Sequence, residues 1–367
     1  MQYSKKLVTI ADAQRKRSVY KLKVGIIGCG RVANTHLRIY RSINRIKPVE
    51  VVAVSSKNLD TARSFAARHR IARFSSDLTT FLQNKDLDLV DICTPTSTHS
   101  HIACATAEFG HDIFLEKPMA LSTAECDKMI NASKQHGVRL CVCHNQLFFP
   151  AVRHAKSLVD SRNYNVLSFK TIHKESPEGP LTFSPAWVFT PQEKGFLWEF
   201  GYHLAYLQLH FLEKITEVYA IGNKVKYPVL DNFSAILATN SKPYGIMELS
   251  MIAKEPEIVY EIDNSDGKSL VIDRISLTST EKPTIQKRSP SSKLGSVLNY
   301  FVPIQKAPRN EWGFFIGHFN LINEYIKCLA NDKPPPVKPE QAKEAIKLLE
   351  CVEKSIDLHK VVRLNDH

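Results

Sequence analysis

Two titratable side chains stand four residues apart in an otherwise almost wholly apolar or aromatic segment, "GFLWEFGYHLAYL", at residues 195–207. They are Glu199 and His203. Because residues i and i+4 share one face of a helix, this spacing predicts that a carboxylate and an imidazole lie side by side. Such a pair suits general acid–base chemistry. It equally suits a structural ion pair, and the segment alone leaves both interpretations open.

The helix that carries this pair is predicted to run from about residue 197 to residue 212. Four of its polar side chains share one stripe at helical spacing, and they are Glu199, His203, Tyr206 and His210. Most other positions are apolar. We therefore expect a largely buried helix whose stripe faces either water or a lined cleft.

A second reactive group follows a predicted strand in "FLEKPMAL", at residues 114–121. Lys117 stands there between Glu116 and Pro118. An ordinary surface lysine needs no such rigid setting, and Pro118 biases Lys117 towards an extended backbone. The amine can donate a hydrogen bond to a substrate hydroxyl or, when partly desolvated, exchange a proton with it.

A glycine-rich turn follows the first predicted strand, "KLKVGIIG". It has the pattern G-x-G-x-x-A and consists of Gly28, Cys29, Gly30, Arg31, Val32 and Ala33. The first glycine permits a tight turn, the second lets a pyrophosphate approach the backbone, and the small alanine allows close helix packing. The N-terminus of the next helix then faces the anion. Because the motif falls between a predicted strand and a predicted helix, it indicates dinucleotide binding.

The end of the second predicted strand bears on which dinucleotide binds. An acidic residue there would accept the 2′-hydroxyl of NAD, but this chain has Ser55, Ser56 and Lys57. Two hydroxyls and a cation suit a 2′-phosphate, so we predict NADP in preference to NAD. The alternative is a solvated loop lysine with no such role.

Two further segments are expected on the same edge of the sheet, since each follows a predicted strand. One is "CTPTSTH", residues 93–99, and the other is the "FLEKPMAL" segment. The residues expected to reach the cofactor from them are Thr94, Pro95, Thr96, His99, Glu116 and Lys117.

The elements that position these groups follow a simple order. Short β-branched segments alternate with helical ones from residue 21 to residue 144, which predicts a doubly wound parallel sheet. Six segments between residues 164 and 279, the last of them 268–279, are predicted as successive strands of an antiparallel sheet, with "NSDG" as a hairpin loop. The expected parts are a basic N-terminal extension (1–20), a Rossmann NAD(P)-binding domain (21–144) and an α/β substrate and oligomerisation domain (145–367).

The last part of the chain is less regular. Residues 278–311 are rich in serine, proline and basic residues and are expected to break the strand pattern. A solvated insertion is the preferred interpretation, with an active-site cover or an oligomer contact as alternatives. Helices follow at about 313–332 and 340–360, and the last of them is expected to bury one apolar face. Whether the final helix packs back on the Rossmann domain is left open.

Composition limits the remaining choices. The chain has 367 residues, of which 43% are hydrophobic and 23% charged, as in a globular protein of two domains. Its net charge of +12 is dispersed outside the first 23 residues and residues 282–309, and no nucleic-acid motif accompanies it. We expect no nucleic-acid or membrane partner and a cytoplasmic location. The eight cysteines show no zinc-type spacing, so reduced structural thiols and no metal are expected.

Three segments, in this order, resemble the glucose-fructose oxidoreductase and inositol dehydrogenase family, Gfo/Idh/MocA. They are "VGIIGCGRVANTH", "CTPTSTHSHIACATAEFGHDIFLEKPMALS" and "WEFGYH", and the similarity covers about residues 22–275 and 312–358. The resemblance implies a Rossmann domain and a C-terminal α/β domain on a large, mainly antiparallel open sheet. It implies NAD(P)-dependent oxidation or reduction at a secondary carbon of a sugar, cyclitol or nucleotide sugar. It also implies a homo-oligomer, a dimer or tetramer, formed through that sheet.

Residue by residue, the resemblance makes Lys117 the lysine of the E-K-P motif, beside the nicotinamide and the reacting hydroxyl. His203 matches the histidine of the D-x-G-x-H pattern, and Glu199 takes its aspartate position with one more methylene. We expect His203 to accept the proton, Lys117 to donate or shuttle it, and Glu199 to orient His203 or bind a neighbouring hydroxyl. The expected substrate-binding residues are Lys117, Asn145, Glu199, His203 and Tyr206.

The chain also departs from the family pattern. Tyr206 replaces a later acidic position, and Asn145 begins N-Q-L-F where many relatives have N-R-R-F. These changes bear on the substrate more than on the reaction type. Two other functions stay open: a glycoside hydrolase that uses tightly held NAD for transient oxidation, and a regulatory protein that binds the cofactor. The presence of both Lys117 and His203 argues against the regulator.

Overall fold

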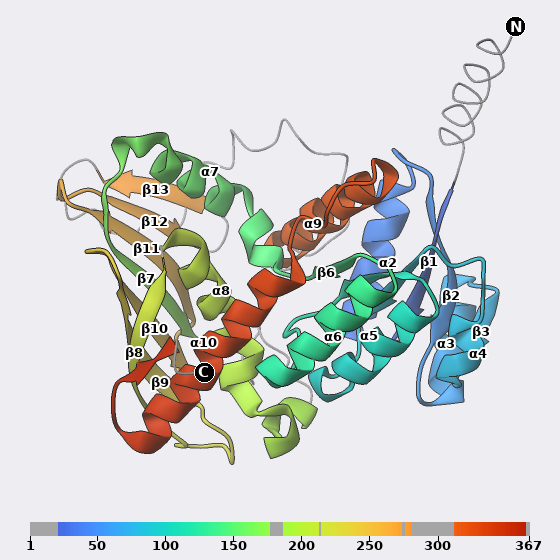
Figure 1. The fold of residues 1–367 in the computed structure, drawn as a ribbon, viewed down its shortest axis with the longest axis horizontal. Helices are drawn as coiled ribbons and strands as arrows, with labels where there is room; N and C mark the ends of the chain where they lie inside the picture. The colour runs from blue at the N-terminus through green and yellow to red at the C-terminus, as the bar shows by residue number, and fades with distance from the viewer. Residues whose placement is uncertain (1–20, 177–185, 213, 274–275, 281–311, 365–367) are drawn as a thin grey trace, which may run out of the picture. The chain divides into compact units, whose positions relative to one another are not determined.

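The computed structural model describes residues 21–176, 186–212, 214–273, 276–280 and 312–364. The chain forms two compact units (Figure 1). The first contains Met1–His144 and Leu321–Ile346, and the second contains Asn145–Asn320 and Lys347–His367. The expected N-terminal extension and residues 281–311 of the expected insertion lie outside the described residues.

The first unit contains a six-stranded sheet in the order β3-β2-β1-β4-β5-β6, and every adjacent pair is parallel. This confirms the predicted doubly wound sheet. Only β3 was missed, because three residues are too few to show a pattern. The strands are β1 (Leu22–Ile27), β2 (Val49–Ser55), β3 (Arg73–Ser75), β4 (Leu89–Ile92), β5 (Asp112–Leu115) and β6 (Leu140–Val142).

Helices cover this sheet, and three of them begin at a residue whose side chain caps the helix. Gly30 precedes α2 and Asn58 caps α3, accepting a hydrogen bond from Thr61 N at 2.9 Å. Helices α5 and α6 pack side by side (Figure 1). The helices are α2 (Arg31–Ile43), α3 (Leu59–His69), α4 (Leu78–Leu82), α5 (His99–Glu108) and α6 (Thr123–Gln135).

The second unit contains an eight-stranded sheet in the order β13-β12-β11-β7-β10-β9-β8-β14. Strands β7 and β10 are parallel and the other adjacent pairs are antiparallel, so the predicted mainly antiparallel sheet is confirmed. The strands are β7 (Val166–Lys174), β8 (Ile215–Asn223), β9 (Asn232–Thr239), β10 (Tyr244–Ser250), β11 (Glu257–Asn264), β12 (Ser269–Asp273), β13 (Ser276–Thr280) and β14 (Val362–Arg363).

The predicted hairpin at "NSDG" is confirmed between β11 and β12. Gly267 has a φ of 74°, and Asn264 Oδ1 accepts a hydrogen bond from Lys268 N at 2.8 Å. The prediction of a single strand over residues 268–279 is wrong, because this range contains two strands, β12 and β13, which pair antiparallel. Residues 278–280 therefore extend the sheet and do not break it. No glycine or proline marks this second turn in the sequence.

The prediction of one continuous α-helix over residues 197–212 is also wrong. A π-helical segment, η6 (Leu197–Gly201), precedes α8 (Tyr202–Phe211), and Leu212 is already extended. Apolar side chains fill both parts, so the sequence has no break that marks the wider turn. Helix α8 packs against β7 and β10 (Figure 1).

Three more helices complete the two units: α7 (Pro150–Leu158), α9 (Trp312–Ala330) and α10 (Pro339–Leu358). The first turns of α10 belong to the first unit, where Lys343 Nζ lies 2.6 Å from Asp127 Oδ1. Most apolar residues of α10 are buried, as the helical spacing predicts, but Leu358 at its end is 46% exposed. Within the described residues, no helix combines the length and apolar character needed to cross a membrane.

Candidate active site

The glycine-rich turn joins β1 to α2, as expected. Gly28 has a φ of 96°, and a Cβ there would overlap the Cys93 carbonyl, so only glycine fits. Around Gly30, no heavy atom lies within 4 Å of the place a Cβ would take. Ala33 is fully buried. Open space over Gly30 at the start of a helix fits a bound pyrophosphate.

The end of β2 lies beside this turn. Gly28 N donates a hydrogen bond to Ser55 O at 2.8 Å, and the Cys29 thiol lies 3.6 Å from the same oxygen. Burial raises the pKa of Cys29 to about 11, so its thiol stays neutral. Ser56 is half-buried and Lys57 is exposed. The three residues expected to select the cofactor therefore adjoin the glycine turn.

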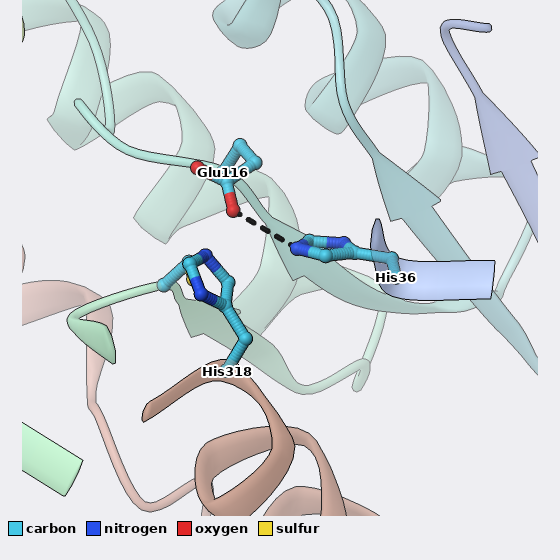
Figure 2. A group of neighbouring side chains, drawn as sticks. His36, Glu116 and His318 are labelled. Atoms are coloured by element: carbon cyan, nitrogen blue, oxygen red, sulfur yellow. Dashed lines mark ion pairs between the residues drawn. The ribbon is translucent and has the colours of Figure 1, made fainter. Parts of the chain in front are cut away.

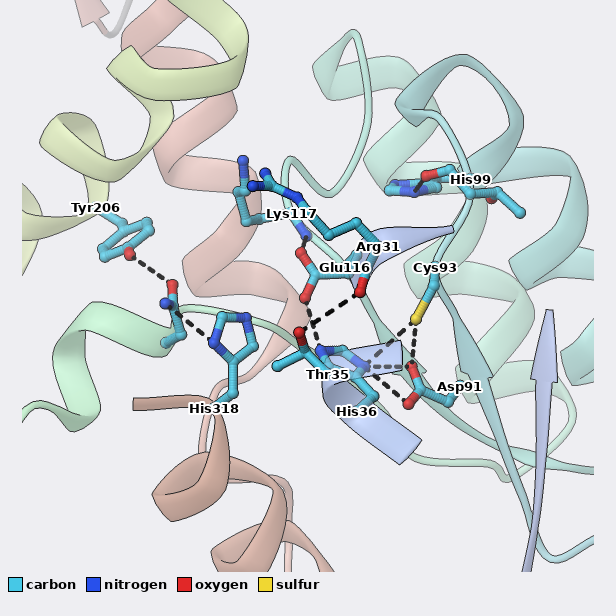
Figure 3. Close-up of polar contacts among 12 residues, drawn as sticks. Arg31, Thr35, His36, Asp91, Cys93, His99, Glu116, Lys117, Tyr206 and His318 are labelled. Atoms are coloured by element: carbon cyan, nitrogen blue, oxygen red, sulfur yellow. Dashed lines mark hydrogen bonds and ion pairs between the residues drawn. The ribbon is translucent and has the colours of Figure 1, made fainter. Parts of the chain in front are cut away.

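His99 contacts both the 93–99 segment and the E-K-P turn (Figure 3). His99 Nε2 lies 2.9 Å from Thr94 O, and His99 Nδ1 lies 2.8 Å from Pro118 O. His99 is fully buried and Thr96 nearly so, and Pro95 O accepts a hydrogen bond from the Thr98 hydroxyl at 2.7 Å. His99 thus holds two segments that were expected to contact the cofactor.

Lys117 follows the end of β5 and is half-buried, and its peptide bond to Pro118 is cis. Glu116 is buried beside it, with only 5% of its surface exposed. Glu116 Oε2 accepts a hydrogen bond from Lys117 N at 3.1 Å. Glu116 therefore holds the backbone of the turn that presents the lysine.

Sequence reasoning missed the group behind Glu116, which we call the His36 bridge: His36, Asp91 and Glu116. Figure 2 shows His36 pointing toward Glu116, and Figure 3 adds Asp91 on its other side. All three side chains are buried. One signal was present, since a carboxylate in the wholly buried strand "LVDI" needs a partner.

In the second unit, Tyr206 connects residues that were expected to bind substrate. Its hydroxyl lies 2.7 Å from His203 Nδ1 and 3.5 Å from Asn145 Oδ1. Asn145 Nδ2 in turn lies 3.3 Å from His318 Nδ1. We call His203, Tyr206, Asn145 and His318 the Tyr206 network. The participation of His318 has no sequence signal, because it comes from α9.

Glu199 lies in η6 and His203 lies in the first turn of α8. The two are therefore not related by the regular α-helical spacing from which their pairing was predicted. Glu199 is half-buried, whereas His203 is buried. Further along the helix, burial and then the Lys156 ammonium lower the pKa of His210 to about 4.

Two groups of described side chains in the first unit have ligand atoms close enough for a metal ion. His36, Glu116 and Cys143 place such atoms within 4.8 Å of one another, as do His36, Asp91 and Cys93. Burial raises the pKa of both thiols well above the ordinary value, which opposes the thiolate a metal needs. The expectation of no metal stays a prediction.

Comparison with known proteins bears on both units. Residues 22–144 match the model of the GFO_IDH_MocA family, described as an oxidoreductase family with an NAD-binding Rossmann fold. The chain is 29% identical over 209 residues to the uncharacterized oxidoreductase YrbE of Bacillus subtilis, which is 57% of this chain and 59% of that protein. The matched region thus spans less than two thirds of that relative.

Two longer matches cover nearly the whole chain. Myo-inositol 2-dehydrogenase of Thermotoga maritima is 22% identical over 352 residues, 94% of this chain and 99% of that protein. The structure of levoglucosan dehydrogenase in complex with NADH has a TM-score of 0.79 at 20% identity, covering 94% of this chain and 99% of that one. This likeness shows that the two proteins share a fold across both units.

Proposed function

We propose that the chain belongs to the Gfo/Idh/MocA oxidoreductase family, whose model matches residues 22–144, and that it is an NAD(P)-dependent dehydrogenase. Its substrate is a secondary alcohol, or the corresponding ketone, of a sugar, cyclitol or nucleotide sugar. One observation carries the proposal: the glycine turn and Lys117 follow β1 and β5, so both lie at the carboxyl edge of the same parallel sheet. Ligands of such sheets bind at that edge. Relatives named as inositol and levoglucosan dehydrogenases support the substrate class.

The residues proposed to hold the cofactor are those at the ends of β1, β2, β4 and β5. The turn from Gly28 to Ala33 receives the pyrophosphate, with the open space at Gly30 next to it. Ser55, Ser56 and Lys57 receive the ribose, and we propose NADP in preference to NAD because no carboxylate stands there. When bound, the nicotinamide supplies the acceptor or donor of the hydride.

The proton chemistry is assigned to this chain's own side chains. Oxidation of a carbinol removes a hydroxyl proton, so a positioned base is required. His203 is the proposed base, and the Tyr206 hydroxyl at Nδ1 orients its ring so that Nε2 exchanges the proton. Lys117 donates to the substrate oxygen and stabilises its developing charge. Glu199 orients His203 or binds a neighbouring hydroxyl, and Asn145 and Tyr206 contact the substrate.

The second unit also supports a homo-oligomer formed through its sheet. Tyr219 and Ile236 are paired across β8 and β9, and 42% and 57% of their surfaces are exposed. Ile221, two residues along β8, is 55% exposed. Apolar side chains grouped on one face of a sheet suit a partner surface, here that of a second copy. The eight cysteines, all in the described residues, are free thiols, which is in keeping with the proposed cytoplasmic location.

The test is absorbance in the reduced-nicotinamide band, recorded with NAD and NADP against a panel of sugars, cyclitols and nucleotide sugars. The proposal expects net cofactor turnover with at least one of them. Release of an aglycone without net turnover would assign the chain to the transient-oxidation hydrolases. Cofactor binding with neither activity across the panel would favour a regulator.

A further inference from the structure

The His36 bridge links three neighbouring elements of the first unit. His36 lies on α2, the helix that follows the glycine turn, and its side chain is fully buried. Asp91 lies in β4, and Glu116 directly follows β5. Figure 3 shows the imidazole between the two carboxylates. The bridge therefore connects the cofactor-binding turn to the segment that carries Lys117.

Both ring nitrogens of His36 face carboxylate oxygens. Nδ1 lies 2.9 Å and 3.1 Å from the two oxygens of Asp91, and Nε2 lies 3.1 Å from Glu116 Oε1. An ionised carboxylate only accepts hydrogen bonds, and a neutral imidazole has one N–H. The doubly protonated imidazolium donates a hydrogen bond to Asp91 and forms an ion pair with Glu116 Oε1, although Nε2 and Oε1 do not meet in hydrogen-bond geometry.

Charge balance agrees with this assignment. A positive charge on His36 compensates the buried carboxylates that it contacts, and burying a carboxylate without compensation is costly in a medium of low dielectric constant. Burial alone would lower the pKa of His36, but the Asp91 carboxylate and its hydrogen bond raise it well above the ordinary value.

The charged bridge reaches Lys117 through Glu116. One oxygen of Glu116 faces His36, and the other accepts the hydrogen bond from Lys117 N. A carboxylate held at both oxygens cannot turn without breaking one contact. On the far side of the lysine, the Pro118 carbonyl is held by His99. The backbone of Lys117 is therefore fixed from two directions.

We propose that His36 is a positioning residue for the E-K-P lysine, acting through Glu116. The inference rests on the proposed function, because it assigns a purpose to holding Lys117. His36 touches neither the substrate nor the cofactor in this assignment. Its imidazolium ties α2, β4 and the turn after β5 together, so that the amine of Lys117 meets the substrate oxygen in one defined place.

A bound metal is the competing interpretation, since His36, Glu116 and Cys143 offer ligand atoms within 4.8 Å of one another. Without a metal ion, burial raises the pKa of the Cys143 thiol and keeps it neutral, so the positive charge facing these carboxylates is that of His36. Metal analysis of the purified full-length protein separates the two. Stoichiometric zinc would overturn the imidazolium bridge, and its absence supports the bridge.

The first test is His36→Gln, which keeps a hydrogen-bonding side chain but removes the charge. We expect kcat to fall by roughly tenfold to a hundredfold, because a small displacement of a reacting group is costly, while the Kd of the cofactor changes less than about twofold. The matched control is His111→Gln. His111 is equally buried in the same unit and contacts the Leu82 and Leu87 carbonyls, at 2.7 Å and 2.9 Å. An equal fall of kcat in the control would overturn the proposal.

The second test asks whether His36 acts through Glu116. We expect the His36→Gln/Glu116→Gln double variant to lose no more kcat than Glu116→Gln alone, because both changes break the same link. If the losses of kcat in the two single variants multiplied in the double variant, His36 would not act through Glu116.

The third test does not depend on turnover, and its NMR part uses the wild-type protein alone. Nitrogen NMR of the wild-type protein at pH 8 should show both nitrogens of His36 protonated, and chemical labelling of the Lys117 amine should change rate in Glu116→Gln. A neutral His36 would overturn the proposal. If the wild type turned over no substrate, the proposed function would be wrong, but the NMR experiment would still show whether His36 is charged.

Discussion

The two units hold their predicted reactive groups in different ways. Behind Lys117 lies a charged bridge, in which one buried imidazole contacts two buried carboxylates. Behind His203 lies a network whose contacts run through a tyrosine hydroxyl and an amide. A histidine between two carboxylates is locked in its charged form. A histidine that is hydrogen-bonded to a hydroxyl can gain or lose a proton without leaving buried carboxylates uncompensated.

This difference suggests a division of work. In the proposed mechanism, the first unit uses charge to fix a donor in place, whereas the second unit uses a polar network to orient a base that changes its protonation state. The predictions that follow test whether the two arrangements have these separate effects.

The largest expected effect comes from the two predicted catalytic residues. Lys117→Ala and His203→Ala should each lower kcat by about a hundredfold to ten-thousandfold, as is usual when a positioned acid or base is removed. Steady-state kinetics with the best substrate of the panel measures it. The control is His154→Ala, at an exposed position of α7, which should leave kcat unchanged. Full turnover by both variants would show that the site assignment is wrong.

A smaller effect separates orientation from proton exchange. Tyr206→Phe keeps the ring but removes the hydroxyl on His203 Nδ1, so kcat should fall about tenfold, the equivalent of about 1.4 kcal/mol, while the Kd of the cofactor stays the same. Tyr164→Phe is the matched control, since the Tyr164 hydroxyl donates to Ile262 O at 2.8 Å elsewhere in the unit. If the two variants had equal kcat, the Tyr206 hydroxyl would have no part in catalysis.

The preference for NADP depends on the end of β2. Lys57→Glu replaces the cation proposed to meet the 2′-phosphate, so kcat/KM for NADP should fall at least about tenfold, with a smaller change for NAD. Lys85→Glu, at another exposed position of the same unit, controls for overall charge. An unchanged ratio of the two cofactors would leave Lys57 as a solvated loop residue.

The smallest effect concerns stability alone. The folded-state pKa of His210, about 4, is below its ordinary value of 6.5. Its contribution is therefore present above pH 6.5 and is lost as the pH falls towards 4, because the unfolded chain binds the proton first. From pH 7 to pH 5, the wild type should lose about 1 kcal/mol more free energy of unfolding than His210→Gln. Urea titrations measure this, with the exposed His154→Gln as control. Equal losses would mean that His210 titrates normally.

Much of the first unit could be predicted because its signals are local. The glycine turn, the strand before it and the helix after it occupy one short stretch, and Lys117 is marked by its immediate neighbours. The same holds for the hairpin at Asn264 to Gly267, where turn residues stand together. Each of these depends on residues that are close in the chain.

What could not be predicted depends on residues that are distant in the chain or on turns without marker residues. The His36 bridge joins residues of three separate elements, and the Tyr206 network includes His318 of α9. The turn between β12 and β13 has no glycine or proline, and η6 is as apolar as the helix that follows. Sequence periodicity distinguishes buried from exposed positions, but it does not choose between an α-helical and a π-helical turn.

The central claim, hydride transfer at a carbinol carbon, is tested most directly with deuterium. The full-length protein is incubated with oxidised cofactor and the best polyol substrate, deuterated at its carbinol carbon, and the reduced cofactor is analysed by mass spectrometry and NMR. The account predicts that the nicotinamide ring carries the deuterium, in a yield matching the ketone formed, and that Lys117→Ala and His203→Ala slow the transfer by about a hundredfold or more. Substrate conversion with an unlabelled, unreduced cofactor would contradict it.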